Sequence, residues 1–181
     1  HHKWREFYEQ VQEKANIDIY ARMAYIDTMT GLGNRTAFLE ENKSNAIFPG
    51  MISYIMMDAN NLKTINDTLG HNKGDELIIT IAKCMRKAVG HNGQCYRIGG
   101  DEFVIILKNK TAAETEEIIN KVRCEIEFAD KQSDITISVA IGYVWTDTEQ
   151  KNLEDLMQHA DDEMYQDKKK TKENKSKENT H

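Results

Sequence analysis

The spacing of apolar residues along this chain predicts helices that alternate with strands. Between residues 4 and 25, apolar side chains recur at helical spacing with charged residues between them, which is typical of an amphipathic helix. Thr111 and Glu114 form a capping-box pattern that opens another helix. The remaining predicted helices cover residues 36–45, 73–89 and 153–164.

Shorter segments are predicted to be strands because they are mostly apolar, or because large apolar residues alternate with small or polar ones. They cover residues 51–57, 94–98, 103–107 and 135–141. Gly99 and Gly100 separate the middle two, and paired glycines supply the positive φ angles of a tight two-residue hairpin turn. A hairpin makes its strands antiparallel, so the sheet cannot be purely parallel. We therefore expect an α/β fold of the α+β kind, with one central, mostly antiparallel sheet flanked by helices.

Composition limits the class of protein. The chain has 181 residues, 39% hydrophobic and 30% charged, which is typical of one soluble globular domain with short extensions. A net charge of −6 argues against a nucleic-acid partner. The three cysteines have no C-x-x-C spacing, so neither a zinc site nor a disulfide framework is indicated, and a reducing compartment is expected. No apolar run approaches the roughly 20 residues of a membrane span.

The two ends of the chain are interpreted as extensions of a central domain. His1 and His2 resemble the end of a purification tag, so we expect further sequence upstream. The helix at residues 4–25 is then either core packing or, as we favour, a linker that continues from an upstream domain. The C-terminal residues are charged and indicate disorder. These interpretations give a linker helix at 1–26, a domain at 27–172 and a disordered tail at 173–181.

Three carboxylates stand where two predicted strands begin or end. Asp58 closes one apolar run, while Asp101 and Glu102 follow the glycine pair at the start of another. If these strands are neighbours, Asp58 and Asp101 converge, and Mg²⁺ binds one or two such carboxylates together with water and phosphate oxygens. The alternative is a solvated turn without chemistry. Spacing alone leaves both interpretations open.

A polar segment with two glycines follows the first of these strands. It contains Asn66, His71 and Asp75. A carboxylate accepts from the N1–H and N2–H groups of guanine and an amide both donates and accepts, so such side chains suit a guanine edge. Lys63 and the lysines near the C-terminus are natural phosphate partners. The alternative, a cap and turn before the next helix, explains only one or two of these residues.

Together these motifs resemble the GGDEF family of diguanylate cyclases over residues 27–172. The matching segments are 27–35 (D-T-M-T-G-L-G-N-R), 58–63 (D-A-N-N-L-K), 66–75 (N-D-T-L-G-H-N-K-G-D), 99–103 (G-G-D-E-F) and 160–168 (A-D-D-E-M-Y-Q-D-K). The resemblance implies a palm-like domain related to nucleotidyl cyclases. Two such domains, facing each other in a homodimer, join two GTP molecules into cyclic di-GMP and release two pyrophosphates. It also implies a cytoplasmic domain with an upstream sensor, compatible with a membrane-anchored full-length protein.

The same resemblance implies roles for individual residues. Mg²⁺, or Mn²⁺ in its place, is assigned to the side chains of Asp58 and Asp101 and to the backbone carbonyl of Ala59. The expected catalytic residues are Asp101, Lys63 and Glu102. Substrate binding is assigned to Asn66, His71, Asp75, Lys168, Lys172, Gly99 and Gly100. Asp101 is the family's candidate acceptor for the proton of the attacking 3′-hydroxyl.

Several departures from the family pattern bear on activity. Asn60 replaces the second aspartate of its motif, Lys172 replaces a common arginine and Asp167 stands where alanine is preferred. Gly90 and Gly93 occupy the positions of an R-x-x-D product-binding site that many family members carry, so we expect no high-affinity product inhibition through this position. We favour an active cyclase, with a GTP-binding regulatory module and a pure interaction domain as alternatives.

Overall fold

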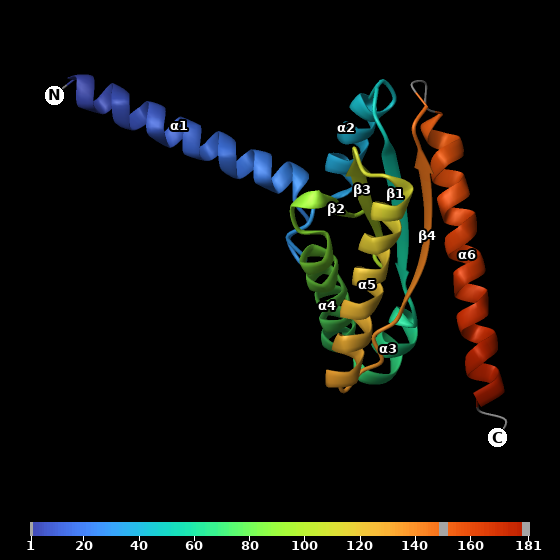
Figure 1. Ribbon diagram of the computed structural model, residues 1–181. Coiled ribbons are helices and arrows are strands. Elements are labelled where there is room, and N and C mark those ends of the chain that lie inside the picture. Colours follow the sequence, from blue (N-terminus) through green and yellow to red (C-terminus); the bar gives the residue numbers. More distant parts are fainter. Residues whose placement is uncertain (1, 149–151, 179–181) are drawn as a thin grey trace.

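A central antiparallel sheet organises the computed structural model, which describes residues 2–148 and 152–178. Within these residues the sheet has four strands in the order β2-β3-β1-β4 (Figure 1). They are β1 (Ile52–Ala59), β2 (Gly93–Arg97), β3 (Glu102–Lys108) and β4 (Val139–Thr146). The sheet and its flanking helices confirm the expected fold class.

β1 is the central strand, and each of its eight residues is buried. It pairs antiparallel with β3 on one side and with β4 on the other. Alternate residues point to opposite faces, so Ile55 and Met57 join one core while Tyr54 and Met56 join the other. Because helices cover both faces, the strand reads as an unbroken apolar run.

The helices form one layer on each face of the sheet (Figure 1). The first layer consists of α3 (Leu62–Leu69), α4 (His71–Val89) and α5 (Ala112–Gln132). The second consists of α2 (Arg35–Asn45) and α6 (Leu153–Glu178). The short 3₁₀ helix η1 (Gly90–Asn92) joins α4 to β2. Thr111 and Glu114 form the predicted capping box at the start of α5.

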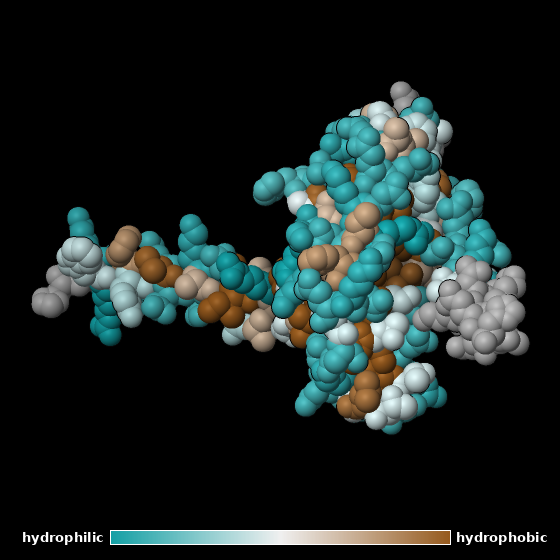
Figure 2. Space-filling view, turned by 60° about the horizontal axis from the view of Figure 1, so that its bottom comes forward, coloured by the Kyte–Doolittle hydropathy of each residue, from teal (hydrophilic) through white to brown (hydrophobic). Residues whose placement is uncertain are grey.

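α1 (His2–Tyr25) projects away from this layered body (Figure 1). Many of its apolar side chains are exposed, among them Trp4 at 77% and Tyr20 at 71%. Figure 2 shows apolar residues scattered along the projecting helix. The apolar stripe is therefore not part of the core of this chain. Among the described residues, no helix is sufficiently long and apolar to cross a membrane.

The fourth strand lies further along the chain than its alternating pattern predicted. β4 begins at Val139, whose partner Ala59 is the last residue of β1, so the preceding residues have no strand left to pair with. Ile135 and Ile137 are nevertheless buried in the core, each 4% exposed. The N–H of Ile137 donates to the Asp130 carboxylate at 2.7 Å instead of joining a ladder. The alternation correctly predicted burial but not strand pairing.

The turn between β2 and β3 also differs from the prediction. Positive φ angles occur at Gly31, Gly70 and Gly90 but at neither glycine of the turn. The turn spans residues 98–101, and Ile98 and Gly99 both donate to the carbonyl oxygen of Glu102, at 2.9 and 3.4 Å. A Cβ at Gly99 would lie 2.5 Å from the Glu102 carboxylate, so a side chain there would make that carboxylate move aside.

The C-terminal segment is more ordered than its composition predicted. α6 continues to Glu178, so residues 173–178, which we expected to be disordered, are helical. Residues 179–181 lie outside the described part of the chain. The long helix brings its middle turns against β4, and this packing positions part of the candidate site.

Candidate active site

Strands β1 and β3 bring carboxylates together at one corner of the sheet. Asp58, near the end of β1, lies opposite Glu102, the first residue of β3. The N–H of Ala59 donates to the carbonyl oxygen of Asp101 at 2.8 Å, which holds the G-G-D-E-F turn beside β1. The structure therefore places Asp58 and Asp101 next to each other, as the strand pattern predicted. Their metal-binding role stays a prediction.

These carboxylates, with Asp161 of α6, form what we call the acid cluster: Asp58, Asp101, Glu102 and Asp161. Burial raises the pKa of Asp58, which is 9% exposed, and the charges of Asp101 and Asp161 raise it further, against the opposing effect of Lys168. Burial also raises the pKa of Glu102, and the three other acids of the cluster add to the shift. Neighbouring negative charge thus acts on both Asp58 and Glu102, and a cation beside them would be favoured.

Lys168 of α6 faces the acid cluster. Its Nζ donates to Asp58 Oδ1 at 2.9 Å. α6 lies this close to the sheet because Gly142 of β4 has no side chain. A Cβ there would lie 2.1 Å from the backbone nitrogen of Met164 and 2.2 Å from the carbonyl oxygen of Ala160. Sequence reasoning assigned Lys168 to phosphate and missed its contact with Asp58, because only the packing of α6 joins these distant positions.

The donor set at the acid cluster fits a hard divalent cation. Among the described residues, no group of three or more His, Cys, Asp or Glu side chains could enclose a metal ion unaided. Asp58, Asp101 and a backbone carbonyl at Ala59 would leave most of an octahedron to water and phosphate oxygens, which is how Mg²⁺ is commonly held beside nucleotides. The crowding of carboxylates is consistent with that arrangement.

The residues predicted to hold guanine gather around the junction of α3 and α4. Asn66 lies in α3, while His71 and Asp75 lie in the first two turns of α4 and are exposed. Gly70, with φ of +89°, separates the two helices. Gly74 gives Asn66 room, since a Cβ at Gly74 would lie 1.8 Å from Asn66 Oδ1. That oxygen is buried and accepts no hydrogen bond in the described structure.

Two further predicted phosphate ligands differ in what the structure describes. Lys63 is exposed on the first turn of α3, and no hydrogen bond or ion pair holds it within the described residues. It is therefore free to reach a bound ligand. The side chain of Lys172 lies outside the described part of the structure.

Arg97 supports the G-G-D-E-F turn in a way that sequence reasoning missed. Its Nη2 and Nε donate to the carbonyl oxygen of Gly100 at 2.8 and 3.3 Å, and its Nη1 lies 3.3 Å from Asp27. Burial alone would raise the pKa of Asp27, but hydrogen bonds from Thr30 and the charge of Arg97 lower it. The D-T-M-T segment and the turn are thus joined through one guanidinium. The available signal was the opposite charge of two residues beside the motifs: Asp27 opens the D-T-M-T segment, and Arg97 stands two residues before the glycine pair.

Two departures from the family pattern make defined contacts. Asn60 is 7% exposed, and its Nδ2 donates to Ser138 Oγ at 2.9 Å. It ties the end of β1 to the segment before β4 and adds no charge to the acid cluster. Asp167 accepts from the N–H of Ile141 at 2.8 Å, on the outer edge of β4. Asp167, which stands where the family prefers alanine, thus binds the edge of the sheet.

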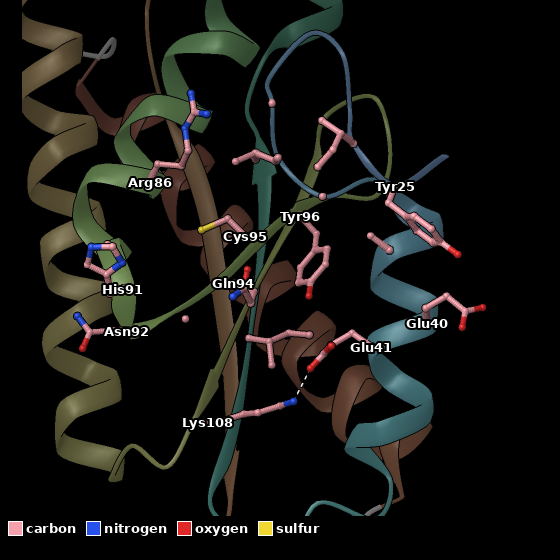
Figure 3. Close-up of a pocket in the computed structure, with 18 residues that line it drawn as sticks. Tyr25, Glu40, Glu41, Arg86, His91, Asn92, Gln94, Cys95, Tyr96 and Lys108 are labelled. Carbon is pink, nitrogen blue, oxygen red and sulfur yellow. Dashed lines mark hydrogen bonds and ion pairs between the residues drawn. The ribbon is translucent and has the colours of Figure 1, made fainter. Parts of the chain in front are cut away.

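A separate hollow of about 910 Å³ lies beside η1, away from the acid cluster. Figure 3 shows Arg86 and His91 on one side of it and Tyr25, Glu40 and Glu41 on the other. Its wall also includes the segment from Gly90 to Gly93, the position of the missing R-x-x-D pair. Arg86 is a guanidinium that sequence reasoning did not consider for this region.

Comparisons with known proteins agree with this geometry. Residues 24–174 match the family described as diguanylate cyclase, GGDEF domain. The signaling protein YkoW of Bacillus subtilis is 35% identical over 170 residues, which are 89% of this chain and 21% of that protein. The diguanylate cyclase DgcN of Escherichia coli is 33% identical over 154 residues, 81% of this chain and 38% of that protein. The chain therefore spans well under half of either relative.

Solved structures share the fold. The coiled coil and GGDEF domain of DgcB from Caulobacter crescentus, in complex with c-di-GMP, superposes with a TM-score of 0.79. The match covers 91% of each chain at 22% sequence identity, so it supports the architecture, including an N-terminal helix. Together with the family match over most of the chain, it leads to one conclusion: this chain belongs to the diguanylate cyclase GGDEF-domain family.

Proposed function

We propose that this chain is the catalytic domain of a diguanylate cyclase. In each of two steps, the 3′-oxygen of one GTP attacks the α-phosphorus of the other and pyrophosphate leaves, so that two GTP molecules become cyclic di-GMP and two pyrophosphates. The observation that carries the proposal is the pairing of Asp58 with an intact G-G-D-E-F turn, in which Glu102 lies opposite Asp58. A cytoplasmic location, where GTP is available, is part of the proposal.

The acid cluster has the central role in this proposal. Asp58, Asp101 and the carbonyl of Ala59 would hold Mg²⁺, or Mn²⁺ in its place. When bound, the ion would polarise phosphate oxygens and lower the pKa of the attacking hydroxyl. Asp101 would accept the hydroxyl proton, and Glu102 would add negative charge beside it. Lys63, Lys168 and Lys172 would neutralise the triphosphate.

The α3–α4 junction would select the base. The exposed carboxylate of Asp75 would accept from guanine N1–H and N2–H, while Asn66 and His71 would complete the contacts to base and ribose. Gly99 and Gly100 would let the turn approach the phosphates. A Cβ at Gly100 would meet no other atom within 4 Å, which is consistent with open space for a ligand.

The reaction requires a second chain. One chain offers one acid cluster, whereas the chemistry needs two GTP molecules in opposed sites. The exposed apolar stripe of α1, which includes Trp4 and Phe7, is the surface that would assist pairing. We further propose that a sensor domain upstream of α1 controls this pairing.

A GTP-binding regulatory module without turnover is the second candidate. It is favoured by Asn60, which replaces a carboxylate and is hydrogen bonded to Ser138 instead of facing a ligand. Incubation of the purified protein with GTP and Mg²⁺, followed by chromatography, separates the candidates. Formation of cyclic di-GMP supports the enzyme, and retained GTP without product supports the regulatory module. If the protein neither makes product nor retains GTP, only an interaction domain is left.

A further inference from the structure

Lys168 forms an ion pair with Asp58, the carboxylate that the proposed function assigns to the metal. The Lys168 Nζ lies 2.9 Å from Asp58 Oδ1, within hydrogen-bond distance. Both side chains are partly shielded from solvent, at 31% and 13% exposure, so water screens this ion pair less than a surface pair. The nucleotide-free protein thus has an internal cation at its candidate metal site.

The surroundings leave Lys168 as the resident counter-charge. Within the described residues, no other lysine or arginine forms an ion pair with a member of the acid cluster. Arg35 lowers the pKa of Glu102 only through its charge. If Lys168 moved away and nothing replaced it, Asp58 would therefore lie among three other carboxylates without a paired cation.

Contacts just before Lys168 hold the backbone of α6 against β4, so a change of partner at Asp58 would involve only the lysine side chain. Asp167, next to Lys168, accepts from the N–H of Ile141 at 2.8 Å. One turn earlier, α6 contacts the backbone at Gly142 so closely that a Cβ would not fit. A lysine side chain has four rotatable bonds and an ammonium that moves freely between acceptors. It can therefore swing from Asp58 to a nearby anion without displacement of the helix.

We propose that Lys168 and the divalent cation are alternative partners of Asp58, and that the triphosphate exchanges one for the other. A dication and an ammonium at the same carboxylate repel each other strongly. The metal alone must displace Lys168 and leave it without a partner. A triphosphate gives Lys168 a new anion, so metal and triphosphate strengthen each other's binding. This inference rests on the proposed function and names Lys168 as the residue that couples the two ligands.

Metal binding to the nucleotide-free protein tests this exchange. Mn²⁺ is titrated into the parent, Lys168→Gln and Lys168→Arg proteins, and free Mn²⁺ is measured by electron paramagnetic resonance. Removal of the charge in Lys168→Gln should tighten Mn²⁺ binding by about 10-fold or more, within the usual range of coupling between ligands. Lys168→Arg keeps a cation and should bind Mn²⁺ as weakly as the parent. Lys169→Gln is the matched control, because Lys169 lies over the Tyr165 ring at 4.4 Å and should change nothing.

The outcomes separate this inference from the proposed function. Equal Mn²⁺ affinity in the parent and Lys168→Gln, or tighter binding that persists in Asp58→Asn/Lys168→Gln, would overturn it. Thermal melts verify folding, and Lys168→Met, which keeps the aliphatic stem, repeats the test if Lys168→Gln unfolds. If Mn²⁺ affinity rises as expected while the parent makes no cyclic di-GMP, the exchange stands and the cyclase proposal fails. Product formation with no change in Mn²⁺ affinity supports the cyclase and overturns the exchange.

Discussion

The acid cluster and the hollow beside η1 belong to the same domain, yet glycine serves opposite purposes in them. At the acid cluster, Gly100 keeps space open beside reactive carboxylates. At the hollow, Gly90 has φ of +53°, where side chains are strained, and a Cβ at Gly93 would lie 2.5 Å from the carbonyl oxygen of Ile106. The first region keeps the carboxylates of the G-G-D-E-F turn beside Asp58, whereas the backbone of the second excludes the charged pair expected at the product-binding site of the family. We therefore expect synthesis without high-affinity feedback inhibition through the hollow.

The largest expected effect is at the acid cluster. Asp101→Asn keeps the size of the side chain but removes the charge that would hold the metal and accept the proton. Cyclic di-GMP synthesis should fall by about 10³-fold or more, since such preorganised charges commonly supply several kcal/mol. Asp162→Asn, on the same helix as Asp161 but bonded to Gln158, is a control that should keep activity. Turnover near that of the parent in Asp101→Asn, or loss of its cooperative unfolding, would contradict the assignment.

A smaller effect is expected where the base is selected. A site built to hydrogen-bond guanine rejects adenine, because adenine leaves the groups of the site unpaired. The parent should therefore prefer GTP over ATP, and Asp75→Ala should reduce this preference by about 100-fold. Competition between the two nucleotides, with products separated by mass, measures the ratio. Comparable incorporation of adenine by the parent would show that Asp75 does not select the base.

The strand pattern predicted the acid cluster better than it predicted its surroundings. Asp58 and Asp101 were expected to meet because each borders an apolar strand, and local sequence contains that information. The contact of Lys168 with Asp58 joins positions 110 residues apart, and it depends on how closely α6 packs on β4. No local pattern encodes that distance. The bond from Asn60 to Ser138 was missed for the same reason.

The limits of the fold prediction were also physical. Alternation at Ile135 and Ile137 predicted burial correctly, but a strand needs a partner and β1 ends at Ala59. The glycine pair predicted a hairpin correctly, but neither glycine of its turn has the positive φ that the pattern implied. Patterns in sequence thus located the elements, and the lengths of their neighbours decided the boundaries.

The dependence on a second chain gives an effect of intermediate size. Activity per chain should rise with protein concentration, because each chain offers one acid cluster. Val11→Glu places a charge in the apolar stripe of α1, where Val11 is 47% exposed, and should shift the activity curve to higher concentration by roughly 10-fold. Gln10→Glu adds the same charge beside the stripe and should shift it less. A specific activity that stays constant through a verified monomer range would exclude the two-chain mechanism.

A still smaller effect concerns the support of the G-G-D-E-F turn. Asp27→Asn weakens the contact with Arg97 and should lower the free energy of unfolding by about 1 kcal/mol, a modest value because the pair is partly exposed. The folded pKa of Asp27 is lowered below its usual 3.8, so its contribution is present above that pH and is lost as the pH falls through the folded pKa. Urea melts of both proteins at neutral pH and near pH 3 should show a smaller difference at the lower pH. An equal difference at both values would mean that the charge of Asp27 is irrelevant.

The smallest expected effect is at the hollow, where product should neither bind tightly nor inhibit. Calorimetry with cyclic di-GMP should show no micromolar site there, and Arg86→Ala and His91→Ala should leave synthesis unchanged at micromolar product. Arg86 and His91 line the hollow, but no carboxylate stands at Gly93 to complete the recognition of guanine. Adding the missing pair as Gly90→Arg and Gly93→Asp should destabilise the domain by about 1–3 kcal/mol, because one position needs a positive φ and the other has no room. Micromolar or tighter binding in the parent that disappears when Gly90 or Gly93 is changed would show that the hollow has kept its function, and the contrast with the acid cluster would no longer hold.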